Sequence, residues 1–96
     1  MEFRQLQTFT RVAEELSFTR AAKKCCLAQS SVSAQIRALE EELALKLFDR
    51  LGRRVLLTDA GRKLYAYARR METMTLELRS EFSKDKYIQG SLTVRV

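Results

Sequence analysis

Apolar residues recur at three- and four-residue steps over the first part of the chain, which is the spacing of one face of an α-helix. The first run consists of Phe3, Leu6, Phe9, Ala13 and Leu16, with charged and polar residues between them. It predicts an amphipathic helix near the start of the chain, interrupted at residues 17 and 18.

Two further helices are predicted by the segment that follows. A short helix begins at Thr19, and its small apolar face is formed by Ala21, Ala22 and Cys25. After a turn at residues 27–29, Ser30 or Ser31 is expected to act as the N-cap of a third helix, because a serine hydroxyl can accept from the free N–H groups of a first turn. The apolar stripe of this third helix is formed by Val32, Ile36, Leu39 and Leu43.

The helical pattern stops near residue 47, and a β-hairpin is predicted there. Residues 50–54 would form its tip around Gly52, with Phe48 on one side and residues 55–57 on the other. A hairpin directly after the third helix would place basic residues beside that helix.

A last, long helix is favoured by Thr58 as N-cap and Asp59 in the first turn, and it is expected to run to about Lys86 before Gly90 breaks it. At ~1.5 Å per residue it would span roughly 40 Å, which is too long for so small a domain to cover. An apolar seam at heptad-like spacing runs along it, formed by Gly61, Leu64, Ala68, Met71, Thr75, Leu78 and Phe82. We therefore expect a second copy of the chain to cover this seam. Residues 92–96 alternate like the first strand of a further unit.

Composition and charge narrow the picture. The 96 residues include no proline and three glycines, which favours helices over many short strands. The formal net charge of +6 indicates an anionic partner, such as nucleic acid or a membrane surface. No apolar stretch is long enough to cross a membrane and the first residues do not resemble a signal peptide, so a cytoplasmic protein is expected.

The two cysteines, Cys25 and Cys26, are adjacent in the sequence. Neighbouring cysteines bridge only with severe strain, so no disulfide is expected, which fits a reducing compartment. Such a pair can bind a soft metal or sense oxidants, but there is no histidine and no third thiol to complete a site. We expect Cys25 to fill the core, Cys26 to lie near the helix end, and the protein to need no metal or cofactor.

The segment 18–45 has the features of a helix-turn-helix. Small residues stand where its two helices would cross, at Ala21 and Ala22, and Leu27 provides an apolar anchor in the turn. The second of these helices begins with hydrogen-bonding side chains, as recognition of base edges requires. The arginines of the hairpin suit a DNA minor groove or backbone.

Several short motifs resemble the N-terminal part of LysR-type transcriptional regulators. They are FTRAA at residues 18–22, AQSSVS at 28–33, IRALE at 36–40, LFDR at 47–50 and LTDAG at 57–61. The resemblance implies a mainly α fold, with a winged helix-turn-helix of three helices and a two-stranded wing, followed by a long linker helix that pairs with its copy in a homodimer. It also implies a tetramer in the full-length protein.

The resemblance also implies a division of the chain. Residues 1–58 would be the DNA-binding domain, 59–87 the linker helix for dimerisation, and 88–96 the start of a domain that senses a small molecule. The first of these would act as a sequence-specific, non-enzymatic binder of double-stranded DNA in transcription regulation.

The candidate site residues follow from this assignment. With the recognition helix in the major groove from about residue 30, base edges would be read by Gln29, Ser33 and Gln35. Backbone or groove contacts would be made by Thr19, Arg20, Ser30, Ser31, Arg37, Arg50, Arg53 and Arg54. The dimer interface would be formed by Leu64, Ala68, Met71, Thr75, Leu78 and Phe82.

The chain departs from the family pattern at three places. Ser30 stands where a proline is common, and it is expected to cap the helix equally well. Ala34 stands where an arginine is common, which removes one DNA contact. Cys25 and Cys26 replace an apolar residue followed by a polar one.

Other functions were weighed on the same residues. The sequence offers no basis for catalysis, because it has no histidine, no glycine-rich phosphate loop and no nucleophile beside a base. The three consecutive glutamates at residues 40–42 are expected to lie along an exposed helix and not to form a catalytic site. A basic coiled-coil adaptor that recruits protein, a nonspecific nucleoid-like DNA binder and a thiol-based sensor remain alternatives.

Overall fold

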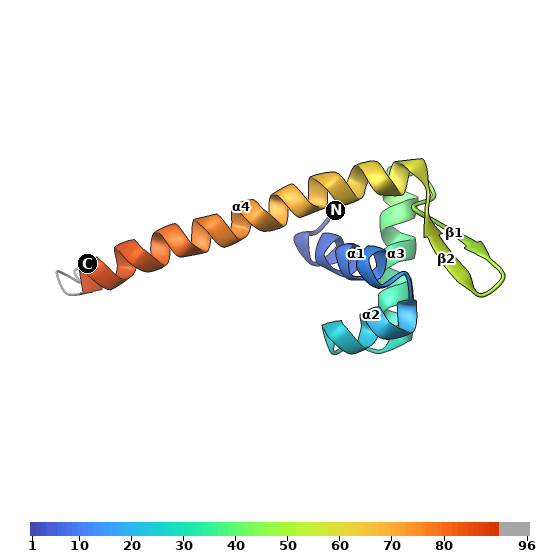
Figure 1. Ribbon diagram of the computed structural model, residues 1–96, viewed down its shortest axis with the longest axis horizontal. Coiled ribbons are helices and arrows are strands. Elements are labelled where there is room, and N and C mark those ends of the chain that lie inside the picture. Colours follow the sequence, from blue (N-terminus) through green and yellow to red (C-terminus); the bar gives the residue numbers. More distant parts are fainter. Residues whose placement is uncertain (91–96) are drawn as a thin grey trace.

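The computed structural model describes residues 1–90, and it describes the burial of side chains as far as residue 83. Within this range the elements are α1 (Phe3–Glu15), α2 (Phe18–Cys25), α3 (Gln29–Leu43), β1 (Phe48–Leu51), β2 (Arg54–Leu57) and α4 (Asp59–Gly90) (Figure 1). The predicted winged helix-turn-helix with a long helix behind it is confirmed. The expected start of a further domain falls largely on residues 91–96, outside the described residues.

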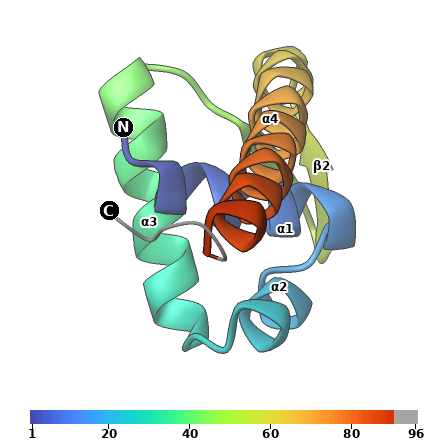
Figure 2. The same ribbon diagram turned by 90° about the vertical axis from the view of Figure 1, so that its left-hand side faces the viewer.

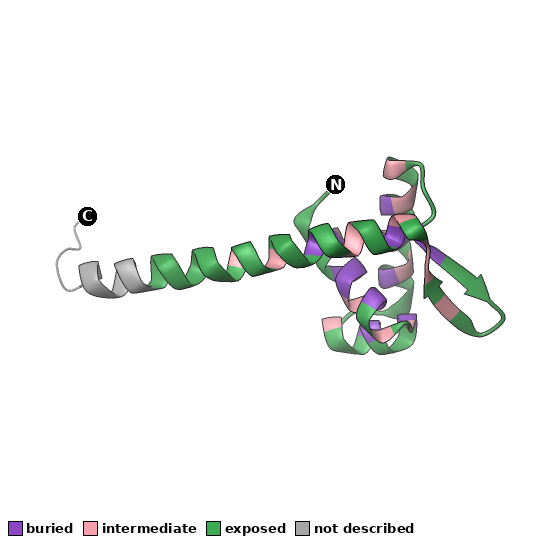
Figure 3. Cartoon of the chain, turned by 45° about the horizontal axis from the view of Figure 1, so that its top comes forward, coloured by how far each residue is buried: buried purple, intermediate pink, exposed green. Residues whose placement is uncertain are grey.

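The core lies where α1, α2 and α3 meet. Phe9, Val12, Val32 and Leu39 are fully buried there. The predicted apolar face of the third helix is confirmed, whereas that of the first is confirmed only in its middle, because Phe3 and Leu16 at its two ends are exposed. Buried positions are concentrated in this compact head, whereas the far part of α4 is largely exposed (Figure 3). The head is therefore a small folded unit from which α4 projects.

The wing is the antiparallel pair β1 and β2, in the register Phe48↔Leu57 and Leu51↔Arg54. Gly52 has a φ of 63°, a left-handed conformation that favours glycine at the tip of a tight hairpin. The ring of Phe48 lies 5.4 Å from that of Phe9, so the wing is anchored in the core of the head.

The expected starts of two helices are wrong. Helix α2 begins at Phe18 rather than Thr19, and the Ser17 hydroxyl accepts the backbone N–H of Arg20 at 3.1 Å. Helix α3 has Ala28 as its N-cap, with no side-chain hydrogen bond at that position, so Ser30 lies inside the first turn and does not cap. The sequence motif predicted that a helix starts here but not which residue stands outside it.

The predicted cap of α4 is confirmed. The backbone N–H of Gly61 donates to the Thr58 hydroxyl oxygen at 3.0 Å, and that hydroxyl donates to the carbonyl of Lys46 at 2.6 Å. Thr58 therefore starts the helix and also ties it to the loop before β1.

None of the helices in residues 1–90 has the length and apolarity that a bilayer crossing requires.

Helix α4 packs across α1, and Figure 2 looks along its axis towards the head. Polar contacts fix the crossing: the Glu14 carboxylate accepts from Arg69 at 3.0 Å, and Arg11 is paired with Glu72. These contacts set the direction in which α4 leaves the head.

The apolar seam of α4 is divided between two environments. Gly61 is buried, Ala68 is 4% exposed, and Leu64 packs partly buried against the core. Ala68 is therefore largely covered by its own head and Leu64 partly so, which leaves them less surface for a dimer interface than the sequence suggested. Further along, Met71, Leu78 and Phe82 are exposed.

Candidate nucleic-acid interface

The first turn of α2, the first turn of α3 and the wing meet around one groove. Its lining includes Thr19 and Arg20 from α2, Gln29 from α3, and a set of wing arginines, namely Arg50, Arg53 and Arg54. All of these side chains belong to exposed residues. The structure thus brings together six of the eleven residues that the sequence suggested for DNA binding.

Electrostatics make this groove attractive to anions. Four arginines line it, and two helices begin beside it with first-turn N–H groups that their own helices cannot satisfy. A phosphate group placed at such a helix start gains both hydrogen bonds and a favourable dipole.

A hydrogen bond joins the two helix starts across the groove. The Thr19 hydroxyl donates to the Oε1 atom of Gln29 at 3.0 Å. Thr19 is the second residue of α2 and Gln29 is the first residue of α3. Thr19 does not cap α2, because Ser17 does so, and its side chain is instead directed at Gln29.

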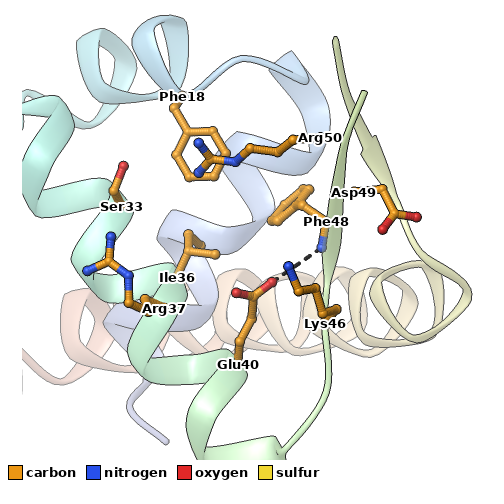
Figure 4. A pocket seen from close by; sticks show the side chains of 9 residues that line it. All are labelled: Phe18, Ser33, Ile36, Arg37, Glu40, Lys46, Phe48, Asp49 and Arg50. Carbon is orange, nitrogen blue, oxygen red and sulfur yellow. Dashed lines mark hydrogen bonds between the residues drawn. The ribbon is translucent and has the colours of Figure 1, made fainter. Parts of the chain in front are cut away.

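A second groove continues from the first between α3 and β1 (Figure 4). Ser33 and Arg37 line it from α3, and Lys46 and Arg50 line it from the wing side. Its floor is apolar and is formed by Phe18, Ile36 and Phe48.

Arg50 is held in place by an aromatic ring. Its guanidinium carbon lies 4.4 Å from the centre of the Phe18 ring, which is the geometry of a cation–π contact (Figure 4). Arg53, at the hairpin tip, is exposed. The arginines of the wing therefore differ, since an aromatic contact positions Arg50 beside α2 and no such contact is found for Arg53 among the described residues.

The sequence suggested that Glu40 lies on an exposed face of α3. In the structure it is instead half-buried. Its Oε2 atom accepts from the backbone N–H of Leu47 at 2.8 Å. It also accepts from that of Phe48 at 3.4 Å (Figure 4). The carboxylate holds the start of β1 against α3, and its negative charge is therefore stabilised by backbone N–H groups of the same chain.

Gln35 is separated from the other predicted base-reading residues. At about 100° per residue, Gln35 and Ser31 lie on the flank of α3 roughly opposite Ser33 and Arg37. The Oε1 atom of Gln35 is buried without a hydrogen-bond partner among the described residues. This placement gives no support to base readout by Gln35, because its oxygen faces the protein.

The outer face of α3 carries Ser30 and Ala34, and both residues are exposed. Ala34 therefore offers only a methyl group at this surface.

Both cysteines are free, with Cys25 half-buried and Cys26 exposed. Burial raises the pKa of the Cys25 thiol, and the nearby Arg11 opposes that shift. No group of three or more metal-ligating side chains is found among the described residues. The expected place of Cys26 at the helix end is confirmed, since it is the C-cap of α2. The expectation that Cys25 fills the core is wrong, because this residue is only half-buried and lies outside the core cluster.

Sequence reasoning missed several residues of these surfaces. Phe18 and Glu40 act on the interface through contacts with residues distant in sequence, which no local pattern indicates. Tyr67 and Met74 are exposed on α4 beside the predicted seam, and a wider apolar arc on a helical wheel would have included them.

Comparisons with known proteins agree with this geometry. Residues 3–62 match the sequence model of the bacterial regulatory helix-turn-helix proteins of the lysR family. The uncharacterized HTH-type transcriptional regulator YwqM of Bacillus subtilis is 42% identical over 98% of this chain and 32% of its own length. The RuBisCO operon transcriptional regulator of Allochromatium vinosum is 41% identical over 100% of this chain and 32% of its own length.

Solved structures show the same architecture. The BenM DNA-binding domain in complex with catB site 1 DNA superposes with a TM-score of 0.84 at 42% identity, covering 88% of this chain and 93% of that one. Full-length CbnR with its target DNA superposes with a TM-score of 0.76 at 37% identity, covering 90% of this chain and 29% of that one. The chain thus spans about a third of the length of the two curated relatives described above.

Proposed function

The chain belongs to the lysR family of bacterial helix-turn-helix regulatory proteins, and from this premise we propose that it is the DNA-binding part of a transcriptional regulator. The observation that carries the proposal is the convergence of two helix starts and three wing arginines on one groove. The protein would act in the cytoplasm on double-stranded DNA and would catalyse no reaction.

Helix α3 enters the major groove in this proposal. Gln29 and Ser33 read base edges, because they lie at its exposed start and on the flank that faces the wing. Arg20 and the free N–H groups of α2 bind a phosphate of the adjacent backbone. Other contacts to backbone or groove are made by Ser30, Ser31, Arg37, Arg50, Arg53 and Arg54.

The exposed apolar stripe of α4 pairs with the same stripe of a second copy. At about 100° per residue its members fall within one arc of the helix, and they are Tyr67, Met71, Met74, Leu78 and Phe82. A stripe of this kind is costly to leave in water, and a second copy provides a matching surface. The remainder of a full-length protein would add a domain that senses a small molecule and would join two dimers into a tetramer.

Selection of bound sequences from random double-stranded DNA tests the function directly. We expect enrichment of a partly palindromic site, because a two-fold symmetric protein places equivalent helices in two half-sites. Recovery of DNA with no common sequence would indicate a nonspecific binder, and failure to retain DNA would indicate a protein-binding adaptor.

The contribution of the wing is tested with Arg53→Ala. We expect weaker binding to all sequences and a salt slope smaller by about one unit, because one phosphate or groove contact is lost. Arg79→Ala, which removes the same charge from an exposed position on α4, is the matched control. Equal effects of the two variants would contradict a wing contact.

A further inference from the structure

We propose that Thr19 is a positioning residue that orients the carboxamide of Gln29, so that Gln29 presents its amide N–H groups to DNA and selects guanine. This inference rests on the proposed function, since it specifies what the start of α3 reads. It assigns Thr19 a role in specificity in place of the backbone contact that its sequence position suggested.

The first step is the hydrogen bond between the two helix starts. The Thr19 hydroxyl has one hydrogen, and it is donated to Oε1 of Gln29 at 3.0 Å. A side-chain amide carries its acceptor and its donors on opposite sides, so holding Oε1 towards α2 turns Nε2 away from α2.

The second step is electrostatic. The starts of α2 and α3 carry the positive ends of their helix dipoles, and Arg20 lines the same groove. A carboxamide oxygen is favoured on this positive side and an amide N–H group is disfavoured there. The surroundings and the Thr19 hydroxyl therefore favour the same orientation of Gln29.

The third step is the chemistry of the base edge. A glutamine that turns both its oxygen and its nitrogen to DNA pairs with adenine, which offers one acceptor and one donor in the major groove. Guanine offers two acceptors, N7 and O6, and suits a group that presents donors. With Oε1 engaged by Thr19, Gln29 is matched to guanine rather than adenine.

The test compares Thr19→Val with Thr19→Ser in this same chain. Valine has the shape of threonine without the hydroxyl, whereas serine keeps the hydroxyl. Thr19 is exposed, so both variants should fold, and thermal unfolding curves check this. Each variant is bound to the selected site and to duplexes in which one base pair at a time is replaced.

We expect the wild-type protein to prefer guanine at one position of the selected DNA site. Gln29→Ala should abolish the discrimination between bases at that position. Thr19→Val should reduce the guanine-to-adenine affinity ratio at that position about fivefold, which corresponds to the loss of one orienting hydrogen bond. Thr19→Ser should keep the ratio. In the Gln29→Ala background, Thr19→Val should have no further effect on it.

Each other outcome overturns the inference. An unchanged ratio in Thr19→Val excludes a positioning role, and an equal loss of affinity for all sequences identifies a backbone contact instead. An adenine preference at the Gln29-dependent position contradicts the proposed orientation. Absence of any sequence preference in the wild type is a separate failure, because it removes the proposed function itself.

Discussion

At the residue scale, Gly61 shows how a tertiary contact reverses a local preference. It lies in the first turns of α4, where alanine would ordinarily favour the helix by about 1 kcal/mol. A Cβ atom at this position would lie 2.2 Å from the carbonyl oxygen of Leu47 and 2.8 Å from a methyl carbon of Leu57. The absent side chain therefore allows α4 to pack closely against the start of the wing.

We expect Gly61→Ala to lower the free energy of unfolding by about 1–3 kcal/mol, because the backbone oxygen of Leu47 cannot move aside without shifting the wing. Thr73→Ala, at an exposed position of the same helix, is the control and should stabilise the protein by up to about 0.7 kcal/mol. Urea denaturation followed by circular dichroism measures both. A stabilised Gly61→Ala variant would show that the contact is looser than described.

At the element scale, the wing is attached to α3 by one carboxylate. Glu40 accepts two backbone N–H groups at the start of β1, and Phe48 packs into the core directly after it. The same strand carries Arg50 at the interface. The position of the wing arginines relative to α3 therefore depends on an acidic residue whose carboxylate is hydrogen-bonded within the fold.

Glu40→Ala should lower the free energy of unfolding by about 1–3 kcal/mol, because it leaves partly buried N–H groups without an acceptor. It should also weaken DNA binding, although it removes a negative charge from a protein that binds an anion. Glu41→Ala removes the same charge from an exposed neighbour and should change stability by less than about 0.5 kcal/mol. Stronger DNA binding by Glu40→Ala than by Glu41→Ala, measured by fluorescence anisotropy, would argue against this attachment.

At the scale of the whole molecule, α4 is the element through which we propose that two copies pair. One face of its first half is fixed to α1 through Glu14 and Arg69 and through Arg11 and Glu72. The apolar arc beside that face remains exposed and continues to Phe82. Because the crossing is fixed, α4 would also set the distance between the two heads of the proposed dimer.

Leu78→Asp should convert the dimer to a monomer, because a carboxylate would be buried against the partner helix. Leu76→Asp is the matched control: Leu76 is 62% exposed and Leu78 is 55% exposed, but Leu76 lies more than about 120° away around the helix. Light scattering gives the mass of each variant. A dimer mass for Leu78→Asp, or a monomer mass for both variants, would contradict the proposed interface.

Much of the fold could be predicted from the sequence because its signals are local. Periodicity located the helices, Gly52 marked the hairpin tip, and Thr58 marked the start of α4. The site was harder to predict. The arginines of the wing and Gln29 were suggested by residue type and by family resemblance, whereas the burial of the Gln35 side-chain oxygen depended on which flank of α3 faces the protein.

What the sequence by itself determined is the set of elements, their order and the family, since these follow from apolar spacing, turn residues and short motifs. The tertiary structure decided which surfaces remain available. In it, Ala68 is buried in the core, the Glu40 carboxylate accepts a backbone N–H group at the start of the wing, and the Thr19 hydroxyl donates to Gln29. The physical reason is that periodicity gives a helix an apolar or a polar face but does not say what that face will contact. Contacts between residues distant in sequence form only when the elements are packed together.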